Sequence, residues 1–143
     1  MNFDADTWGP HYWFFLHTIA EFYPLTPNEV TKKKYYELLT NMPLFIPNEE
    51  MGNKFSEILD KYPVSPYLDN RDSLVRWMHF VHNKYNVMLG KEEVSLARAL
   101  DMYRDQYKPK KISFLDDIRF KSRYIHFGFI LFLIVMIYKY YSE

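Results

Sequence analysis

The stretch that decides the fold is residues 77–91, which read WMHFVHNKYNVMLGK. An α-helix turns by about 100° per residue, so side chains three or four positions apart share a face. The apolar face of this predicted helix consists of Leu74, Trp77, Met78, Val81, Tyr85, Met88 and Leu89. The opposite face carries His79, His82, Asn83 and Asn86. These neutral groups both donate and accept hydrogen bonds, so they indicate either a binding site for a polar, partly apolar ligand or ordinary surface residues.

A metal site is a further interpretation of the two histidines, because His79 and His82 are three positions apart on one helix. Protein metal sites need more ligands than two, and no third ligand is evident in the sequence. The chain also contains no cysteine, which excludes disulfides, zinc–thiolate sites and thiol nucleophiles within it. We therefore predict no metal site.

A matching face is predicted on an earlier helix, where Trp13, His17 and Ala20 follow one another at helical spacing. A lone histidine on an apolar helix is usually a satisfied core residue. Trp13 and His17 could equally meet the face that carries His82 and Asn86. Two faces of aromatic rings and imidazoles would then form a slot for a planar ring system.

Helix-capping and helix-stopping residues recur along the chain, and alternating strand patterns are scarce. The predicted helices run from a cap at Thr7 to Tyr23, from a capping box at residues 26–29 to near Pro43, from a cap at Asn48 to Tyr62, from a cap at Asn70 to Leu89, and from Ser95 to near Tyr107. Short connections make neighbouring helices antiparallel. Residues 1–107 are therefore predicted to form an all-α four-helix bundle with a short fifth helix.

Charge and length exclude some partners. The 143 residues suffice for one domain, and 18 Lys and Arg balance 18 Asp and Glu. A chain without net charge is not a general nucleic-acid binder, and the run Lys32–Lys34 is interpreted as a solvated helix face. We expect no nucleic-acid partner.

A second feature is the apolar run YIHFGFILFLIVMIY at residues 124–138. As a helix it is about 22 Å long, which is short for a bilayer core of about 30 Å, although flanking tyrosines and Lys139 can extend it. A buried core helix is the alternative. We predict a single-pass transmembrane tail anchor at residues 124–141, preceded by a basic linker at residues 108–123. The six basic residues of that linker predict a cytosolic N-terminal domain, and Asp4 and Asp6 argue against a signal sequence.

Four segments resemble the Erv/ALR-type FAD-linked sulfhydryl oxidases. The first segment contains Trp8-Gly9 with Trp13, Leu16-His17-Thr18 and Tyr23-Pro24, which are similar to the family's WGxxxW, LHT and YP. The second is residues 77–91, similar to the family's W…HNxVNxxLGK signature with Tyr85 in place of Val. The third and fourth are residues 103–107, similar to its WRDxW-type ending, and residues 45–51, similar to its YPCxxC. Together they span about residues 8–107. Small members of this family occur in large DNA viruses. The resemblance therefore implies that the anchored protein would lie in a host or virion membrane.

The resemblance implies an FAD cofactor and the residues that bind it. Trp13 and His17 would line the flavin, while Lys91 would approach phosphate or ribose. The adenosine and diphosphate part would be held by His82, Asn83 and Asn86, with Tyr85 packing nearby. The remaining implied cofactor residues are Gly9, Trp77, Leu89 and Tyr107.

The resemblance fails at the family's cysteines. Its redox-active CxxC falls on Asn48 and Met51, and its second intrachain disulfide falls on His79 and Leu96. An amide and a thioether cannot pass electrons as a dithiol does, which implies a redox-inactive homologue without catalytic residues. The family also implies a homodimer, or a heterodimer with a cysteine-bearing homologue. Two alternatives stay open: a tail-anchored structural or interaction protein that binds no flavin, and an oxidase whose flavin is attacked directly by substrate thiols.

Overall fold

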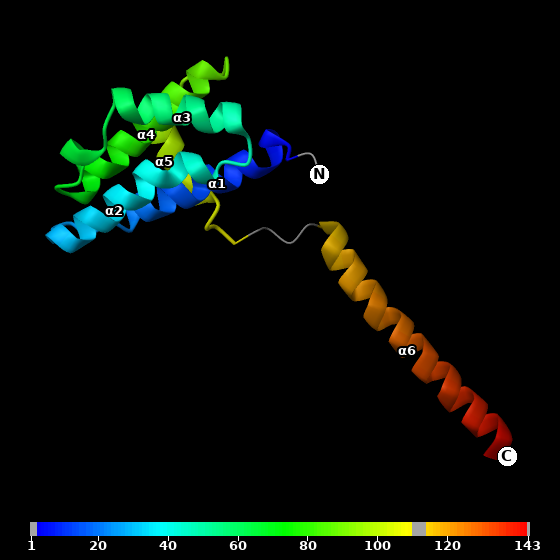
Figure 1. Cartoon of the computed structure of the whole chain (residues 1–143). Coiled ribbons are helices and arrows are strands. Elements are labelled where there is room, and N and C mark those ends of the chain that lie inside the picture. The colour runs from blue at the N-terminus through cyan, green and yellow to red at the C-terminus, as the bar shows by residue number, and fades with distance from the viewer. Residues whose placement is uncertain (1–2, 110–113, 143) are drawn as a thin grey trace. The chain divides into compact units, whose positions relative to one another are not determined.

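The computed structural model describes residues 3–109 and 114–142, and within those ranges it contains helices and no strands (Figure 1). The chain divides into two compact units, Met1–Tyr107 and Lys108–Glu143. The α-helices in chain order are α1 (Ala5–Glu21), α2 (Glu29–Asn41), α3 (Glu49–Lys61), α4 (Arg71–Met88), α5 (Leu96–Asp105) and α6 (Phe114–Ser142). Two short 3-10 helices, η1 (Met42–Phe45) and η2 (Ser65–Tyr67), lie between them. The predicted all-α class is confirmed.

Three of the predicted helix caps are confirmed. The side chain of Asn48 accepts a hydrogen bond from the Met51 backbone N–H, and Asn70 and Ser95 cap α4 and α5 in the same way. Each satisfies a backbone donor that has no partner within the helix. Gly90, just after α4, has φ +72°, a conformation that glycine adopts without strain.

Two predicted starts are corrected. The cap of α1 is Asp4, whose carboxylate accepts from the Asp6 N–H, and Thr7 lies inside the first turn, where its hydroxyl donates to Asp4. Asn28 alone caps α2, so the helix begins after Thr26 and Pro27. In both cases several capping residues stand close together, and the one whose side chain reaches the N2 or N3 amide decides the boundary.

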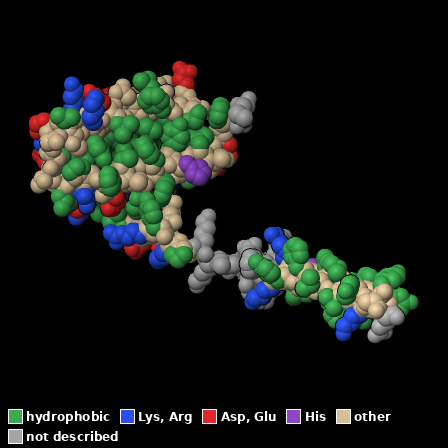
Figure 2. All heavy atoms as spheres, turned by 90° about the horizontal axis from the view of Figure 1, so that it is seen from below, with side chains coloured by type: hydrophobic (Ala, Val, Ile, Leu, Met, Phe, Trp, Pro, Cys, Tyr) green, Lys and Arg blue, Asp and Glu red, His purple; other side chains and the backbone are tan. Residues whose placement is uncertain are grey.

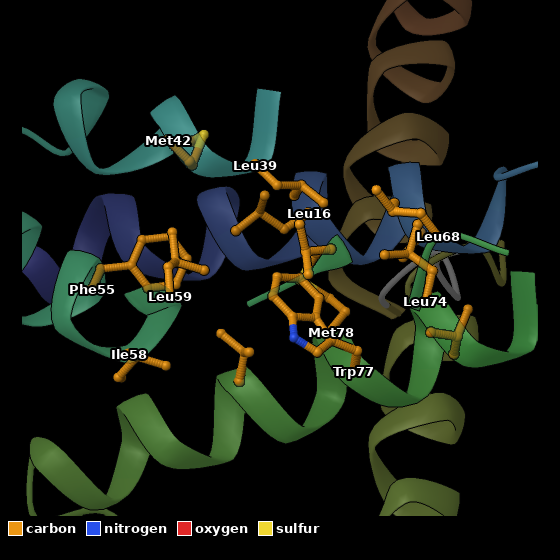
Figure 3. Packing of buried hydrophobic residues seen from close by; sticks show 14 of the residues in the cluster. Leu16, Leu39, Met42, Phe55, Ile58, Leu59, Leu68, Leu74, Trp77 and Met78 are labelled. Carbon is orange, nitrogen blue, oxygen red and sulfur yellow. The ribbon is translucent and has the colours of Figure 1, made fainter. Parts of the chain in front are cut away.

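The core of the first unit lies between α1, α3 and α4, with α4 packed against both α1 and α3. Figure 3 shows side chains from these helices pointing toward each other, with Leu16 of α1, Phe55 of α3 and Met78 of α4 among them. Leu74 and Val81 are fully buried, which confirms the apolar face predicted for α4. Met88 lies at the end of that face and remains 39% exposed.

Helix α3 approaches η1 closely at Gly52. A Cβ atom on Gly52 would lie 2.8 Å from the carbonyl oxygen of Pro43, inside van der Waals contact. Glycine at this position lets α3 pack against η1, and so places the N-terminus of α3 beside α4.

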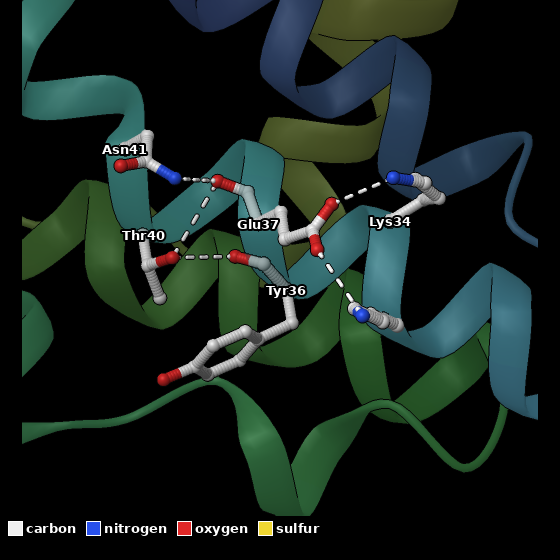
Figure 4. A network of polar contacts seen from close by, with 6 residues as sticks. Lys34, Tyr36, Glu37, Thr40 and Asn41 are labelled. Carbon is white, nitrogen blue, oxygen red and sulfur yellow. Dashed lines mark hydrogen bonds and ion pairs between the residues drawn. The ribbon is translucent and has the colours of Figure 1, made fainter.

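The basic run of α2 forms ion pairs, three of them within α2 and one with Asp69. Figure 4 shows Glu37 between two lysines; Lys34 Nζ lies 2.9 Å and Lys33 Nζ 3.9 Å from its carboxylate oxygens. Lys32 pairs with Glu29 and with Asp69. These exposed pairs agree with a solvated helix face.

The second unit is dominated by α6. Its stretch Lys121–Ser142 has 22 residues and a mean hydropathy of 1.5, and is long and apolar enough to cross a membrane. At 1.5 Å per residue it measures about 33 Å, because it includes residues on both sides of the apolar run 124–138, and it is as long as a bilayer core is thick. Helix α6 begins at Phe114, inside the predicted basic linker, and residues 110–113 of that linker lie outside the described ones. Figure 2 shows mainly hydrophobic side chains along the described part of this helix.

Candidate functional site

A cavity of about 510 Å³ lies within the first unit, bordered by α1, α4 and α5. Its volume is in the range of small-molecule and cofactor sites. Aromatic rings, imidazoles and amides make up much of its lining, and methionine and aliphatic side chains fill the rest.

Nine of the eleven predicted cofactor residues line this cavity. They are Gly9, Trp13, His17, His82, Asn83, Tyr85, Asn86, Leu89 and Lys91. Residues from positions 9 to 91 thus come together because α1 packs against α4. The fold brings the two faces that the sequence singled out to one place.

Trp77 and Tyr107 lie elsewhere. Trp77 is 2% exposed in the core, and its indole N–H donates to the carbonyl oxygen of Tyr62 at 3.0 Å. It faces α3, because residues 77 and 82 point to different sides of α4. Tyr107 is exposed, and its hydroxyl lies 2.9 Å from that of Tyr103.

The predicted slot between Trp13 and His82 is closed. The two rings stack at 3.8 Å between centroids with 7° between their planes, which leaves no room for another ring. His17 Nε2 lies 2.9 Å from His82 Nδ1. The two faces therefore contact each other directly, and the cavity lies alongside the stack.

Burial keeps the imidazoles of this stack neutral. Removal from water lowers the pKa of His17 to about 4, with a smaller contribution from His79. Removal from water also lowers the pKa of His82 to about 3, followed by the effects of His17, His79 and Lys91. At neutral pH, one ring nitrogen of the His17–His82 pair donates and the other accepts.

The two asparagines of α4 have different surroundings. Asn83 Nδ2 donates to the Val94 carbonyl at 2.8 Å, and the Val94 N–H donates to Asn83 Oδ1 at 3.0 Å. Asn83 thus holds the segment that leads into α5. The side chain of Asn86 makes no hydrogen bond within the described residues, and it faces the cavity. Its amide is the one available to a ligand.

Helix α5 contributes a wall that the sequence analysis did not identify. Ala99, Met102 and Tyr103 of this helix and its C-cap residue Gln106 line the cavity. Their spacing, three, four and seven positions on from the first, is a helical face that could have found them. The Tyr103 hydroxyl donates to Thr18 Oγ1 at 3.1 Å and so joins α5 to α1.

Asn48 and Met51, on which the resemblance was expected to place the CxxC, lie at the start of α3. Asn48 caps the helix, while Met51 lines the cavity and its carbonyl accepts from the Tyr85 hydroxyl at 3.2 Å. A thiol at a helix N-terminus has a lowered pKa, but neither side chain here is a thiol. His79 and Leu96 both border a separate void of about 10 Å³, at the lower limit for one water molecule.

The charges of the lining are few. Asp6 and Lys91 are its charged residues, and Lys91 Nζ lies 3.7 Å from Asp6 Oδ1. The described residues hold no group of three or more His, Asp or Glu side chains that could bind a metal ion. The arrangement suits a planar heteroaromatic ligand with polar substituents and an anionic part near Lys91.

The Erv1/Alr family model matches residues 10–108 of this chain. A probable FAD-linked sulfhydryl oxidase of Acanthamoeba polyphaga mimivirus is 31% identical over 109 residues, which are 76% of either chain. An FAD-linked sulfhydryl oxidase of Arabidopsis thaliana is 37% identical over 79 residues, which are 55% of this chain and 40% of the plant protein. The chain thus spans less than half of that relative.

Solved structures show the same fold. The FAD-binding domain of Erv1 from Saccharomyces cerevisiae superposes with a TM-score of 0.66 at 24% identity, over 75% of this chain and 100% of the yeast domain. The yeast Erv1 core gives a TM-score of 0.63 at 23% identity, over 78% of this chain and 89% of that structure.

Proposed function

Since this chain belongs to the Erv1/Alr family, we propose that its helical body binds FAD in the cavity beside Trp13 and His82, and that it does not oxidise thiols through a cysteine pair of its own. The observation that carries the proposal is that nine residues implied by the family resemblance line a single cavity.

The residues present fit FAD. The aromatic lining offers flat surfaces to flavin and adenine rings, and the Asn86 amide has donor and acceptor atoms to spare. A Cβ atom on Gly9 would meet nothing within 4 Å, so the backbone of α1 leaves space beside the cavity. Lys91 supplies a positive charge for phosphate.

In this proposal the chain's own residues bind and orient the cofactor. His17 and His82 stay neutral and contribute hydrogen bonds, while Tyr103 closes the cavity from α5. FAD, when bound, supplies the capacity to accept two electrons. The family's thiol relay to it is missing, because Asn48 has no redox couple and Met51 does not exchange with disulfides.

We propose further that α6 anchors the protein in a membrane with the body on the cytosolic side. The stretch Lys121–Ser142 has the required length and hydropathy, and basic residues at its N-terminal end favour that orientation. Protease protection of the full chain inserted into microsomes tests the topology: a digested body supports it, and a body shielded in the lumen overturns it.

We also propose that the body pairs with a second copy or with a cysteine-bearing homologue. Exposed apolar side chains on and after α1 and on α2 favour such contacts; Phe22 is 81% and Val30 69% exposed. Figure 2 shows hydrophobic side chains gathered on one face of the body. Light scattering of the full chain in detergent tests self-association, and a monomer at all concentrations would leave only the heterodimer.

FAD binding is tested on the full chain purified in a nonionic detergent. We expect a yellow protein with about one FAD per chain, and about 2- to 10-fold weaker FAD binding for Asn86→Ala, because one or two hydrogen bonds are lost. The control is Asn53→Ala, an exposed asparagine outside the cavity. A colourless protein that FAD does not reconstitute would favour the structural or interaction protein.

Oxygen consumption with a dithiol substrate tests redox inactivity separately. We expect turnover no faster than that of free FAD at the same concentration. Turnover well above this level would show direct attack of substrate thiols on the bound flavin and would contradict the redox-inactive proposal.

A further inference from the structure

The cavity has one cationic and one anionic side chain in its lining, and the two are paired with each other. Lys91 follows the C-terminus of α4 and Asp6 lies in the first turn of α1. Their charged atoms are 3.7 Å apart, so the pair joins two elements that border the cavity. The histidines of the lining are neutral and do not alter this balance.

We propose that Asp6 determines specificity by competing with ligand phosphate for Lys91, and thereby shifts the preference of the cavity from phosphorylated toward unphosphorylated flavins. This inference rests on the proposed flavin-binding function. A diphosphate can use the Lys91 ammonium fully only when the ammonium leaves Asp6, and the Asp6 carboxylate also repels the incoming charge.

The accessibility of the pair makes this competition possible. The side chains of Lys91 and Asp6 are 59% and 87% exposed, so both can change partner without opening the core. Exposed ion pairs change equilibrium constants by about 1.4- to 5-fold. An effect of this size can alter the preference between phosphorylated and unphosphorylated flavins but cannot exclude either of them.

Apart from the general effect of a negative charge in the first turn of a helix, the Asp6 carboxylate is not needed to cap α1. The cap of α1 is Asp4, and Asp6 contributes only its backbone N–H to that cap. Within the part of the chain that the structure describes, the Asp6 carboxylate makes no other hydrogen bond or ion pair. Replacing it with asparagine keeps its size and removes its charge.

The test compares FAD with riboflavin, which carries no phosphate, on the full chain in nonionic detergent. Affinities are measured by quenching of flavin fluorescence at low salt. We expect Asp6→Asn to bind FAD about 2- to 5-fold more tightly and riboflavin unchanged. The matched control, Glu92→Gln, removes one negative charge beside Lys91 in sequence but outside the cavity lining, and it should leave the ratio of the two affinities unchanged.

Two further measurements sharpen the result. In about 1 M NaCl, where charges are screened beyond about 3 Å, the advantage of Asp6→Asn should nearly vanish. In a Lys91→Gln background, the gain from Asp6→Asn should shrink, because the cation for which both groups compete is gone.

The outcomes are distinct. Binding of FAD by the wild type with equal FAD-to-riboflavin ratios for Asp6→Asn and Glu92→Gln would overturn this inference and leave FAD binding intact. Failure of every variant to bind either flavin would overturn the proposed function, and this inference with it.

Discussion

The stability of the helical body should fall steeply between pH 7.5 and pH 5, because His17 and His82 are buried as neutral rings. Burial lowers their pKa values from 6.5 to about 4 and about 3. In the unfolded chain both titrate near 6.5, so below that pH the unfolded state binds more protons than the folded one. Stability is therefore complete above about pH 7.5 and is lost as the pH falls.

The magnitude follows from the unfolded pKa alone. At pH 5, protonation of each of these histidines lowers the free energy of the unfolded state by about 2 kcal/mol, because the pH is about 1.5 units below the pKa in the unfolded chain and each unit corresponds to about 1.36 kcal/mol. In the folded state both imidazoles stay nearly neutral at this pH. The two together remove about 4 kcal/mol from the free energy of unfolding. His79, whose pKa is also lowered by burial, acts in the same direction. A domain of this size has about 5–15 kcal/mol in all.

Urea unfolding of the full chain in nonionic detergent, followed by tryptophan fluorescence, measures this loss. Trp13 stacks on His82 and reports directly on the site. His82→Gln should be less stable than wild type at pH 7.5 but lose about 2 kcal/mol less on going to pH 5. The control is His11→Gln at an exposed position outside the cavity, which should keep the wild-type pH dependence. An identical pH dependence for His82→Gln and wild type would refute the reasoning.

Two predictions concern packing at other points of the body. Gly52→Ala should lower the free energy of unfolding by about 1–3 kcal/mol, because the new Cβ would meet the Pro43 carbonyl oxygen. The control, Gly9→Ala, should not be destabilising, because a Cβ there meets nothing within 4 Å. Thermal unfolding compares the two variants, and equal midpoints would contradict the close contact at Gly52. The double substitution His79→Cys/Leu96→Cys should form a disulfide, since both residues border the same small void, and should raise the free energy of unfolding by about 3 kcal/mol. A thiol count under denaturing conditions and a melting midpoint with and without reductant measure it, and two free thiols after oxidation would show that the side chains do not meet.

Since no disulfide joins the element that carries His79 to α5, the position of α5 depends on packing and hydrogen bonds. Asn83 binds both backbone groups of Val94 and so fixes the approach to α5. The Tyr103–Thr18 hydrogen bond fixes α5 to α1. These contacts hold a helix that has no fully buried residue of its own over the cavity.

Local interactions explain what the sequence determined by itself. The caps at Asn48, Asn70 and Ser95 depend on an amide two or three residues away, and the apolar face of α4 depends on helical spacing, so both could be read along the chain. The long apolar run could also be recognised as a possible membrane span. The starts of α1 and α2 were misplaced, because capping residues stand close together there: Asp4 and Thr7 at α1, Thr26 and Asn28 at α2.

The tertiary structure decided what depends on two helices at once. How closely α1 and α4 approach each other determines that Trp13 stacks on His82 and closes the predicted slot. The pairing of Asp6 with Lys91 and the wall formed by α5 arise in the same way. Such contacts join residues far apart in the chain, and their geometry is set by the packing of whole helices, which the spacing of residues along one helix does not contain.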